Sequence, residues 1–246
     1  CSWQNIEFGK NMTNDQSPVT ALVEFEVDTS SVSVAEWLSV WQTRSEDALQ
    51  GEPETKAYAA ALSRESPNQV LIFERYSNGQ ESIDAHINRD AHKTLNEVMD
   101  GRQMTRRRVM SNLFSDIDNY GWWDRGDAGP MQAKDVIISI LGTRFPDSAS
   151  RERYIEVTQQ HANYCRTSEP DTLIYNGCIA QRDADRGPDI RVGDLIFVAA
   201  FRNEAAMLKH RDDPRHIELQ PVLEDINRDR RFALSYLTTG QGFLWK

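Results

Sequence analysis

The sequence predicts an α+β protein that consists of two ferredoxin-like βαββαβ units, packed sheet to sheet within one chain. Two observations lead to this prediction. Short motifs recur in the same order at a nearly constant spacing, which indicates an internal duplication. Between those motifs, hydrophobic patterns with the period of a strand and of a helix follow each other in the same order. A four-stranded sheet with helices on one face leaves its other face bare, and pairing two such faces buries both.

The duplication is clearest in two motifs. The motif Glu-Pro-x-Thr-x-x-Tyr occurs at residues 52–58 and again at 169–175, which is an offset of 117 residues (169 − 52). Between its Pro and its Thr, Glu54 of the first copy corresponds to Asp171 of the second. Leu-Ile-Phe occurs at residues 71–73 and again at 195–197, an offset of 124 (195 − 71). The difference between the offsets indicates one insertion in the second copy, and the polar run 181–188 fits it as an enlarged loop.

The second offset also relates side chains that could serve a function. His86 corresponds to His210 in this alignment, and Tyr76 corresponds to Ala200. We therefore expect the two copies to share a fold but to differ in their pockets, with one pocket specialised.

The elements of the first copy follow from local patterns. Residues 22–27 alternate between apolar and polar side chains, as in a half-buried strand. Ser33 can cap a helix over residues 34–50, in which Trp37 and Trp41 recur on one face. The remaining predicted elements are strands at 56–63, 69–76 and 108–114 and a helix at 81–99.

The second copy repeats this order. Its predicted strands span residues 136–142, 173–181, 194–201 and 232–238, and its predicted helices span 150–165 and 204–226. The expected organisation is a first unit at 19–123, a linker at 124–133 and a second unit at 134–246. Because the linker keeps the units at a high local concentration, we expect them to pair within the chain, while further homo-oligomerisation stays open.

Composition restricts the classes of function. The formal charge of −10 argues against a nucleic-acid partner, and no stretch reaches the ~18 apolar residues of a membrane helix, so no membrane partner is expected. The cysteines Cys1, Cys165 and Cys178 form no Cys-x-x-Cys pair, and their odd number suits a reducing compartment. The first residues lack the pattern of a secretory signal, so a cytoplasmic location is expected.

Several motifs resemble the antibiotic biosynthesis monooxygenase domain. In the first copy they are Glu-Pro-x-Thr-x-x-Tyr (52–58), Phe-Glu-x-Tyr (73–76) and Ala-His-x-x-x-x-x-His (85–92). The second copy resembles the same family through residues 169–175 and 210–216. The resemblance covers most of both copies and implies a dimeric α/β-barrel with a pocket in each unit, between the sheet and the helices.

The resemblance leaves several activities open. Family members include oxygenases that oxidise aromatic polyketides without metal or flavin, haem-degrading enzymes, isomerases and proteins without known activity. The haem-degrading members have an Asn on the first strand, a Trp on the third strand and a His on the second helix. Only the His is present here, at His86 and His210, so haem is not expected as a cofactor. The resemblance favours an oxygenase with molecular oxygen as co-substrate and no bound cofactor.

His86 and His210 are the candidate catalytic bases. Imidazole titrates near neutral pH, so a histidine can take a phenolic proton and leave an electron-rich anion able to give an electron to oxygen. Tyr76 can donate a hydrogen bond to a substrate oxygen from the pocket wall. The alternative is structural: each histidine bonds a backbone carbonyl and holds the second helix of its unit, and Tyr76 packs in the barrel.

Aromatic side chains are the candidate substrate-binding residues, because a flat apolar wall suits a polycyclic ligand. They are Trp37, Trp41, Phe73, Tyr154 and Phe197. Core packing is the alternative for the two tryptophans of the first helix.

No metal site is predicted. The pairs His86/His92 and His210/His216 are each separated by six positions (92 − 86), which on one helix places the two rings on different faces. His161 stands alone on the first helix of the second copy.

The sequence therefore favours a cofactor-independent monooxygenase of secondary metabolism that oxidises an aromatic or polyketide-like small molecule. Two alternatives stay open. A non-redox isomerase, cyclase or decarboxylase would use the same acid–base groups, and a non-catalytic binding protein would use only the pocket.

Overall fold

The computed structural model describes residues 16–127 and 129–246, so Cys1 lies outside the described part of the chain. The first unit contains β1 (Val19–Val27), α1 (Val34–Gly51), β2 (Thr55–Ser63), β3 (Gln69–Tyr76), α2 (Gly79–Asn88), α3 (Asp90–Gly101) and β4 (Thr105–Asp116). The second unit contains β5 (Met131–Arg144), α4 (Ser148–Ser168), β6 (Thr172–Ala180), β7 (Leu195–Phe201), α5 (Glu204–Arg211), α6 (Pro214–Glu224) and β8 (Asp229–Trp245). β5 thus begins inside the segment expected to be a linker, residues 124–133.

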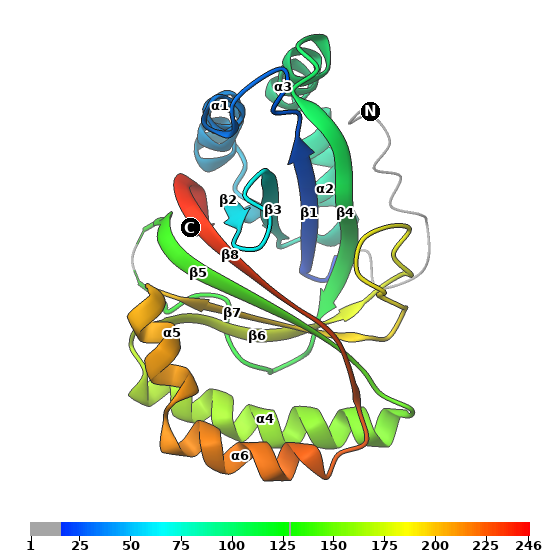
Figure 1. The fold of residues 1–246 in the computed structure, drawn as a ribbon, viewed down its shortest axis with the longest axis vertical. Coiled ribbons are helices and arrows are strands. Elements are labelled where there is room, and N and C mark those ends of the chain that lie inside the picture. The colour runs from blue at the N-terminus through cyan, green and yellow to red at the C-terminus, as the bar shows by residue number, and fades with distance from the viewer. Residues whose placement is uncertain (1–15, 128) are drawn as a thin grey trace.

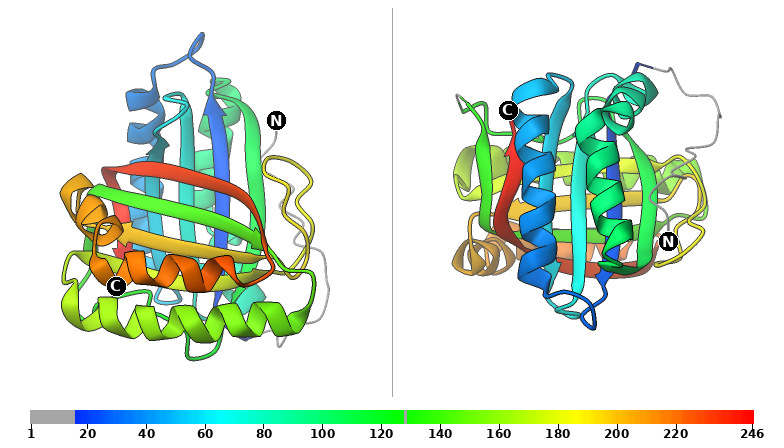
Figure 2. Two further views of the ribbon diagram at one scale, coloured as in Figure 1. Left: turned by 60° about the horizontal axis from the view of Figure 1, so that its bottom comes forward. Right: turned by 90° about the horizontal axis from the view of Figure 1, so that it is seen from above.

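The described strands close into a single barrel, in the order β1-β3-β2-β8-β5-β7-β6-β4, with every neighbouring pair antiparallel. Within each unit four strands form one sheet, and the two sheets join along the pairs β2–β8 and β4–β6. The helices α1, α2 and α3 cover the outer face of the first sheet, and α4, α5 and α6 cover the second (Figure 1 and Figure 2). This arrangement confirms the predicted fold class, in which two ferredoxin-like units pair sheet to sheet within one chain.

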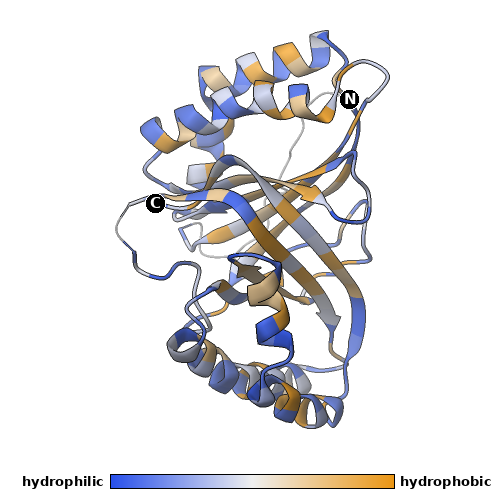
Figure 3. Cartoon of the chain, turned by 60° about the vertical axis from the view of Figure 1, so that its left-hand side comes forward, coloured by the Kyte–Doolittle hydropathy of each residue, from blue (hydrophilic) through white to orange (hydrophobic). Residues whose placement is uncertain are grey.

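Side chains alternate along each strand and so produce two kinds of hydrophobic core. One core fills the barrel, where β2 contributes the small residues Ala57, Ala59 and Ala61. Another lies between the first sheet and its helices and contains Trp37 and Trp41, both fully buried. Figure 3 shows that both the strands and the helices carry apolar as well as hydrophilic residues. Among the described helices, none has an apolar stretch of the length that a bilayer crossing requires.

The second helix of each unit differs from the prediction of one continuous helix at 81–99 and at 204–226. In the first unit the backbone of Arg89 is extended (φ −64°, ψ 144°), which separates α2 from α3. In the second unit Asp213 caps α6 and Pro214 lies in its first turn, because proline has no N–H with which to continue α5. Histidines before and after each break therefore lie on different helices, and the argument that they point to different faces of one helix is wrong.

Strand pairing corrects the alignment of the two copies in β3 and β7. Tyr76 pairs with Thr55 of β2, and the equivalent pair in the second unit is Phe201 with Thr172 of β6. Tyr76 therefore corresponds to Phe201, and not to Ala200 as the Leu-Ile-Phe motif suggested. The difference matters because a shift of one residue moves a side chain to the other face of a strand.

Each unit ends in a segment that crosses onto the other unit. After β4, Trp122 forms a bridge with Tyr175 of β6, and near the end of β8, Phe243 pairs with Tyr58 of β2. Gly242 permits this close approach (φ +87°), since a Cβ atom there would lie 2.0 Å from the carbonyl oxygen of Tyr58. The two units are thus interlocked at both crossing segments.

A cation on each crossing segment caps the first helix of the other unit. Lys246 Nζ donates hydrogen bonds to the carbonyl oxygens of Ala48 (2.6 Å) and Leu49 (3.1 Å) near the end of α1. Arg125 donates to the carbonyl oxygen of Arg166 (2.9 Å) near the end of α4. Positive charge at a helix C-terminus satisfies unpaired carbonyl groups and opposes the negative end of the helix dipole.

Candidate functional site

The motif at residues 52–58 forms one side of a buried polar cluster in the first unit. Glu52 directly follows α1, and its Oε2 atom accepts a hydrogen bond from Thr55 Oγ1 (2.6 Å) at the start of β2. His86 comes from α2, and its Nδ1 atom lies 2.7 Å from the same Oε2 atom. The short connection between α1 and β2 fixes the carboxylate, and α2 brings the imidazole to it. The result is a carboxylate–imidazole pair between the sheet and the helices.

The second unit contains the same pair. Glu169 Oε2 accepts a hydrogen bond from Thr172 Oγ1 (2.7 Å) and lies 2.8 Å from His210 Nδ1. Both candidate bases thus bond a carboxylate, and not the backbone carbonyl that the structural alternative expected, while their catalytic or structural role stays a prediction. The two glutamates were not predicted as site residues, although their recurrence with threonine in both copies was the signal that could have identified them.

Aromatic rings enclose His86, which is 2 % exposed. The centroid of its ring lies 4.9 Å from that of Tyr58, 5.4 Å from that of Tyr76 and 5.1 Å from that of His92. Nδ1 lies 2.7 Å from Glu52 Oε2 and 2.8 Å from a guanidinium nitrogen of Arg44, whereas Nε2 forms no hydrogen bond with any described residue. Nε2 is therefore the nitrogen that can exchange a proton with a ligand.

The structure brings Tyr76 next to His86, as expected for two members of one site. The hydroxyl of Tyr76 donates a hydrogen bond to Glu74 Oε2 (2.6 Å). Burial raises the pKa of Glu74 to about 7, although this hydrogen bond opposes the shift. Burial, followed by the charge of Glu74, raises the pKa of Tyr76 well above its ordinary value. At neutral pH Tyr76 is therefore a protonated donor, and Glu74 is divided between its charged and neutral forms.

Electrostatics keeps Glu52 charged and His86 neutral. Burial opposes the charge on Glu52, but the hydrogen bonds from His86 and Thr55 and the nearby guanidinium lower its pKa far below the usual range. Burial lowers the pKa of His86, and the hydrogen bond to Glu52 opposes this shift only in part. Nδ1 faces both an acceptor, Glu52, and a donor, Arg44. In the tautomer that directs its Nδ1 proton at Glu52, the neutral imidazole can accept a proton at Nε2.

Arg44 of α1, which the sequence analysis did not identify, completes the cluster. It is 1 % exposed, and its guanidinium is paired with Glu52. It also donates hydrogen bonds to Asp47 Oδ2 (3.0 Å) and to the carbonyl oxygen of His86 (3.2 Å). Arg44 therefore neutralises the buried carboxylate and connects α1 to α2.

The second unit has different residues at this place. With the offset of 117, Arg44 corresponds to His161 and Ala48 corresponds to Cys165. The structure places ligand atoms of His161, Cys165 and His210 within 4.8 Å of one another, and all three residues are buried. The prediction that His161 stands alone is therefore wrong. The available signal was its spacing of one helical turn from Cys165.

Trp37 and Trp41 are packed beside the polar cluster, both 0 % exposed. Trp37 Nε1 donates a hydrogen bond to Thr105 Oγ1 (3.0 Å), and Trp41 Nε1 donates to the hydroxyl of Tyr58 (3.1 Å). Because Tyr58 contacts His86, the Trp41 indole supports the cluster. Trp37, in contrast, packs near Phe25 in the same hydrophobic core. Their geometry favours the core-packing alternative over an open pocket wall.

The other predicted substrate-binding residues lie on different faces of the sheets. Phe73 belongs to the barrel core, where its ring lies 6.2 Å from that of Trp123, on the opposite face of β3 from Tyr76. Phe197 packs against the helices of the second unit, and Tyr154 belongs to the same apolar cluster there. The structure therefore does not bring the five aromatic residues into one site.

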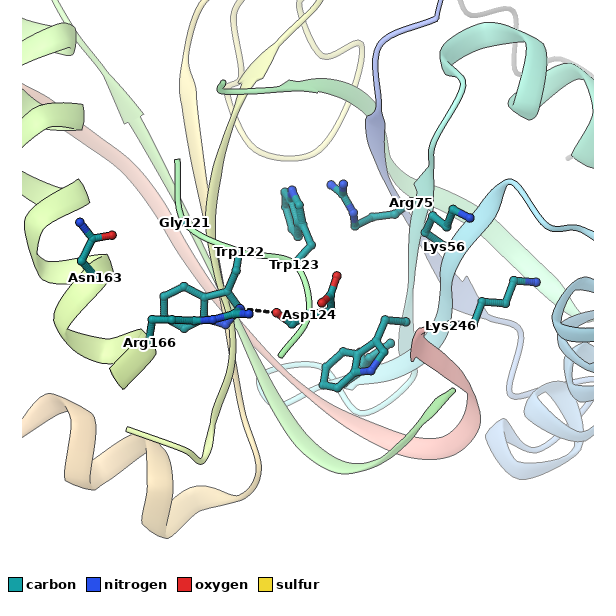
Figure 4. Close-up of a pocket in the computed structure, with 11 residues that line it drawn as sticks. Lys56, Arg75, Gly121, Trp122, Trp123, Asp124, Asn163, Arg166 and Lys246 are labelled. Atoms are coloured by element: carbon teal, nitrogen blue, oxygen red, sulfur yellow. Dashed lines mark hydrogen bonds between the residues drawn. The ribbon is translucent and has the colours of Figure 1, made fainter. Parts of the chain in front are cut away.

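An open cleft lies beside the crossing segments, with lining residues from both units (Figure 4). Its volume is about 560 Å³, which is within the range of small-molecule sites. Tryptophans and cations dominate the lining: Trp122, Trp123, Trp245, Lys56, Arg75, Arg166 and Lys246. Arg75 lies over the ring of Trp123, with its guanidinium carbon 3.7 Å from the ring centroid. The sequence analysis did not predict this cleft, because its residues come from distant parts of both units.

Comparison with known proteins agrees with this architecture. Residues 18–98 match the family model of antibiotic biosynthesis monooxygenases. Comparison with curated protein sequences gave no match. Two crystal structures, each named as a "putative monooxygenase", align with 94% of this chain at 12% identity. The one from Lactobacillus acidophilus is covered over 100% of its length (TM-score 0.68), and the one from Fusobacterium nucleatum over 95% (TM-score 0.71).

A third crystal structure, of an anthrone oxidase-like protein, aligns with 96% of this chain and 97% of its own, at 8% identity and a TM-score of 0.56. At these identities the likeness to solved structures concerns the fold alone. The alignments extend over both units, whereas the family model matches the first. The first unit therefore matches the family model of antibiotic biosynthesis monooxygenases, and the second unit repeats the same fold.

Proposed function

We propose that the chain is a monooxygenase that oxidises an aromatic or polyketide-like small molecule in its first unit, with molecular oxygen as co-substrate and no cofactor in the reaction. The observation that carries this proposal is the buried pair of Glu52 and His86, whose imidazole ring is packed against the rings of Tyr58 and Tyr76. The family match over the same unit supports the reaction class. A role in secondary metabolism accords with such a substrate.

The pair can start the reaction by removing a proton from the substrate. His86 Nε2 takes the proton, and Glu52 stabilises the resulting imidazolium through Nδ1. The substrate anion transfers an electron to O₂, and the two radicals combine to a peroxide, which takes the proton back from His86. Loss of water then leaves a carbonyl group, so that a CH₂ group and O₂ give C=O and H₂O.

Substrate entry requires a helix to move, because the rings around His86 are closely packed. We expect the N-terminal part of α2 to move, because its C-terminal part is held to α1 by Glu52 and Arg44. α2 is only 10 residues long, and its N-cap residue, Asn78, makes no capping hydrogen bond with its side chain. α1 is held more firmly, since Ser33 caps its first turn and Lys246 caps its last turn.

Oxygen uptake tests the proposal directly. Full-length protein with an anthrone substrate and a metal chelator should consume oxygen faster than buffer does, and His86→Ala should lower kcat by about 100-fold or more. Asp84→Ala, an exposed change on the same helix, is the matched control and should leave the rate unchanged. No uptake above buffer with anthrone substrates would contradict the proposal. Equal turnover without oxygen would indicate the non-redox isomerase, cyclase or decarboxylase instead.

A second candidate function, the binding of an anionic aromatic molecule without chemistry, is favoured by the cleft between the units. Three indoles offer apolar surface there, and Lys56 and Arg166 suit a carboxylate or phenolate. Arg75, in contrast, is paired with Asp116, and Asp124 also lines the cleft. Titration with naphthoate should quench tryptophan fluorescence, and Lys56→Met and Trp245→Leu should each weaken binding about tenfold. Lys93→Met, an exposed change on α3, is the control. An unquenched signal at millimolar naphthoate would exclude this candidate.

A further inference from the structure

The two units differ in how they compensate their buried carboxylate. In the first unit, Glu52 Oε1 accepts a hydrogen bond from Arg44. In the second unit, Oε1 of Glu169 is buried and has no hydrogen-bond partner in the described part of the chain. A buried carboxylate oxygen without a partner is costly. The second unit therefore has a place for a cation that none of its described lysines or arginines fills.

Potential metal ligands have replaced the arginine at this place. His161 occupies the position of Arg44, Cys165 lies one turn further along α4, and His210 comes from α5. Cys165 Sγ lies 3.4 Å from His161 Nε2 and 3.8 Å from His210 Nδ1. The three side chains therefore converge from two helices on one buried point.

The two sulfur–nitrogen separations fit a tetrahedral metal site, and the ligand atoms of the three residues all lie within 4.8 Å of one another. Zn²⁺ binds thiolate sulfur at about 2.3 Å and imidazole nitrogen at about 2.0–2.1 Å, so two ligands of a regular tetrahedron lie about 3.5 Å apart for sulfur and nitrogen. The same geometry places two nitrogen ligands about 3.4 Å apart. The two observed sulfur–nitrogen distances, 3.4 Å and 3.8 Å, lie on either side of the expected separation of about 3.5 Å. His216 Nδ1 borders the site and lies 3.4 Å from His161 Nε2, the separation expected for two nitrogen ligands.

The charges of the proposed site also sum to zero, because a divalent ion is balanced by the thiolate of Cys165 and the carboxylate of Glu169. In the first unit the positive charge of Arg44 balances the negative charge of Glu52 in the same way. Thr172 Oγ1 donates to Glu169 Oε2 (2.7 Å), and the same oxygen lies 2.8 Å from His210 Nδ1. A metal ion on Nδ1 replaces the hydrogen bond between His210 and Glu169, and the carboxylate then lies beside the ion and compensates its charge.

We propose that the second unit binds one divalent metal ion of the zinc type through His161 Nε2, Cys165 Sγ and His210 Nδ1. The ion joins α4 to α5, as the guanidinium of Arg44 joins α1 to α2. The fourth position stays open to water. This site belongs to the second unit, so metal binding and oxygen uptake by the first unit are measured independently.

Metal titration of the full-length protein tests the proposal. After chelation and dialysis, the wild-type protein should bind one Zn²⁺ per chain, and Co²⁺ should give the absorption of a tetrahedral site with a thiolate-to-metal charge-transfer band. Cys165→Ala should abolish that band and weaken Zn²⁺ binding by more than about 100-fold. Cys178→Ala is the matched control: that thiol is also buried, but it lies in the barrel core, where it donates to the carbonyl oxygen of Ile196 (3.4 Å).

A double variant keeps the test decisive if Cys165→Ala fails to fold. His161→Arg with Cys165→Ala gives the second unit the residues of the first, so it should fold with a guanidinium beside Glu169 and bind no ion. The proposal is overturned if the wild-type protein binds no stoichiometric Zn²⁺, if Co²⁺ gives no thiolate band, or if either variant binds the metals as the wild type does. It is also overturned if Cys178→Ala abolishes binding as completely as Cys165→Ala does.

Discussion

Replacing Arg44 by methionine should destabilise the first unit strongly, because the change leaves Glu52 as a buried charge. Arg44 and Glu52 are 1 % and 7 % exposed, and breaking such a pair by removing one partner costs about 3–5 kcal/mol. Arg89 Nε, 3.3 Å from Glu52 Oε1, retains part of the compensation, so the expected loss is at the lower end, about 3 kcal/mol. For a chain of this length, that loss corresponds to a decrease in melting temperature of about 6–12 °C.

Urea unfolding followed by circular dichroism measures this loss. Arg64→Met is the matched control, because Arg64 pairs with Glu204 at 2.7 Å but both side chains are exposed, 35% and 52%. The control should lose less than about 1 kcal/mol. Adding Glu52→Gln to Arg44→Met should restore part of the stability, since the unpaired charge is then removed. A loss in Arg44→Met no larger than that of the control would refute the reasoning.

Three further predictions concern pH, packing and the crossing segment. Glu74→Gln should stabilise the protein at pH 8 by about 1–2 kcal/mol and have little effect at pH 4. Burial raises the pKa of the Glu74 carboxyl from 4.5 in the unfolded chain to about 7 in the native protein. Its contribution to the free energy of unfolding is therefore fully present below pH 4.5 and is lost as the pH rises through about 7. Equal urea midpoint shifts at both pH values would contradict this. Trp41→Phe should cost about 2–4 kcal/mol in urea unfolding, because it removes the hydrogen bond to Tyr58 and leaves a void. A cost below about 1 kcal/mol would instead indicate an open pocket beside the indole. Gly242→Ala should cost more than about 2 kcal/mol, because its Cβ atom would collide with the backbone of Tyr58. Gly126→Ala, at φ +75° with open space around it, should cost about 1 kcal/mol, and equal losses in calorimetry would disprove the collision.

The fold could be predicted because its signals are local and occur twice. Strand alternation, helix periodicity and the repeated motifs all lie within short stretches of sequence. The break between α2 and α3 could not be predicted in this way, because it has a tertiary cause. The backbone of Arg89 is extended, and its side chain donates hydrogen bonds to Asp47 of α1 (2.7 Å) and to the carbonyl oxygen of Gly51 (3.3 Å). The register error in β3 arose because short apolar motifs recur by composition as well as by descent.

The candidate site was predicted only in part. The two histidines were identified because they recur, but their partners come from other elements. Glu52 is 34 residues from His86, and only the folded chain brings the two together. The same holds for Cys165 and His210, which are 45 residues apart. Periodicity also could not decide whether Trp41 packs in a core or lines a pocket, because both roles place it on the same face of the helix.

The crossing segments make each unit dependent on the other for its stability. The last turn of α1 is capped by Lys246, and the last turn of α4 is capped by Arg125, so each helix is completed by a residue from the segment that follows the last strand of the other unit. The two halves are therefore expected to unfold in one cooperative transition, and a ligand that binds only one of them raises the melting temperature of both. Thermodynamic coupling of this kind lets one half lose residues needed for its own stability while the other compensates, which is a physical route by which duplicated units diverge.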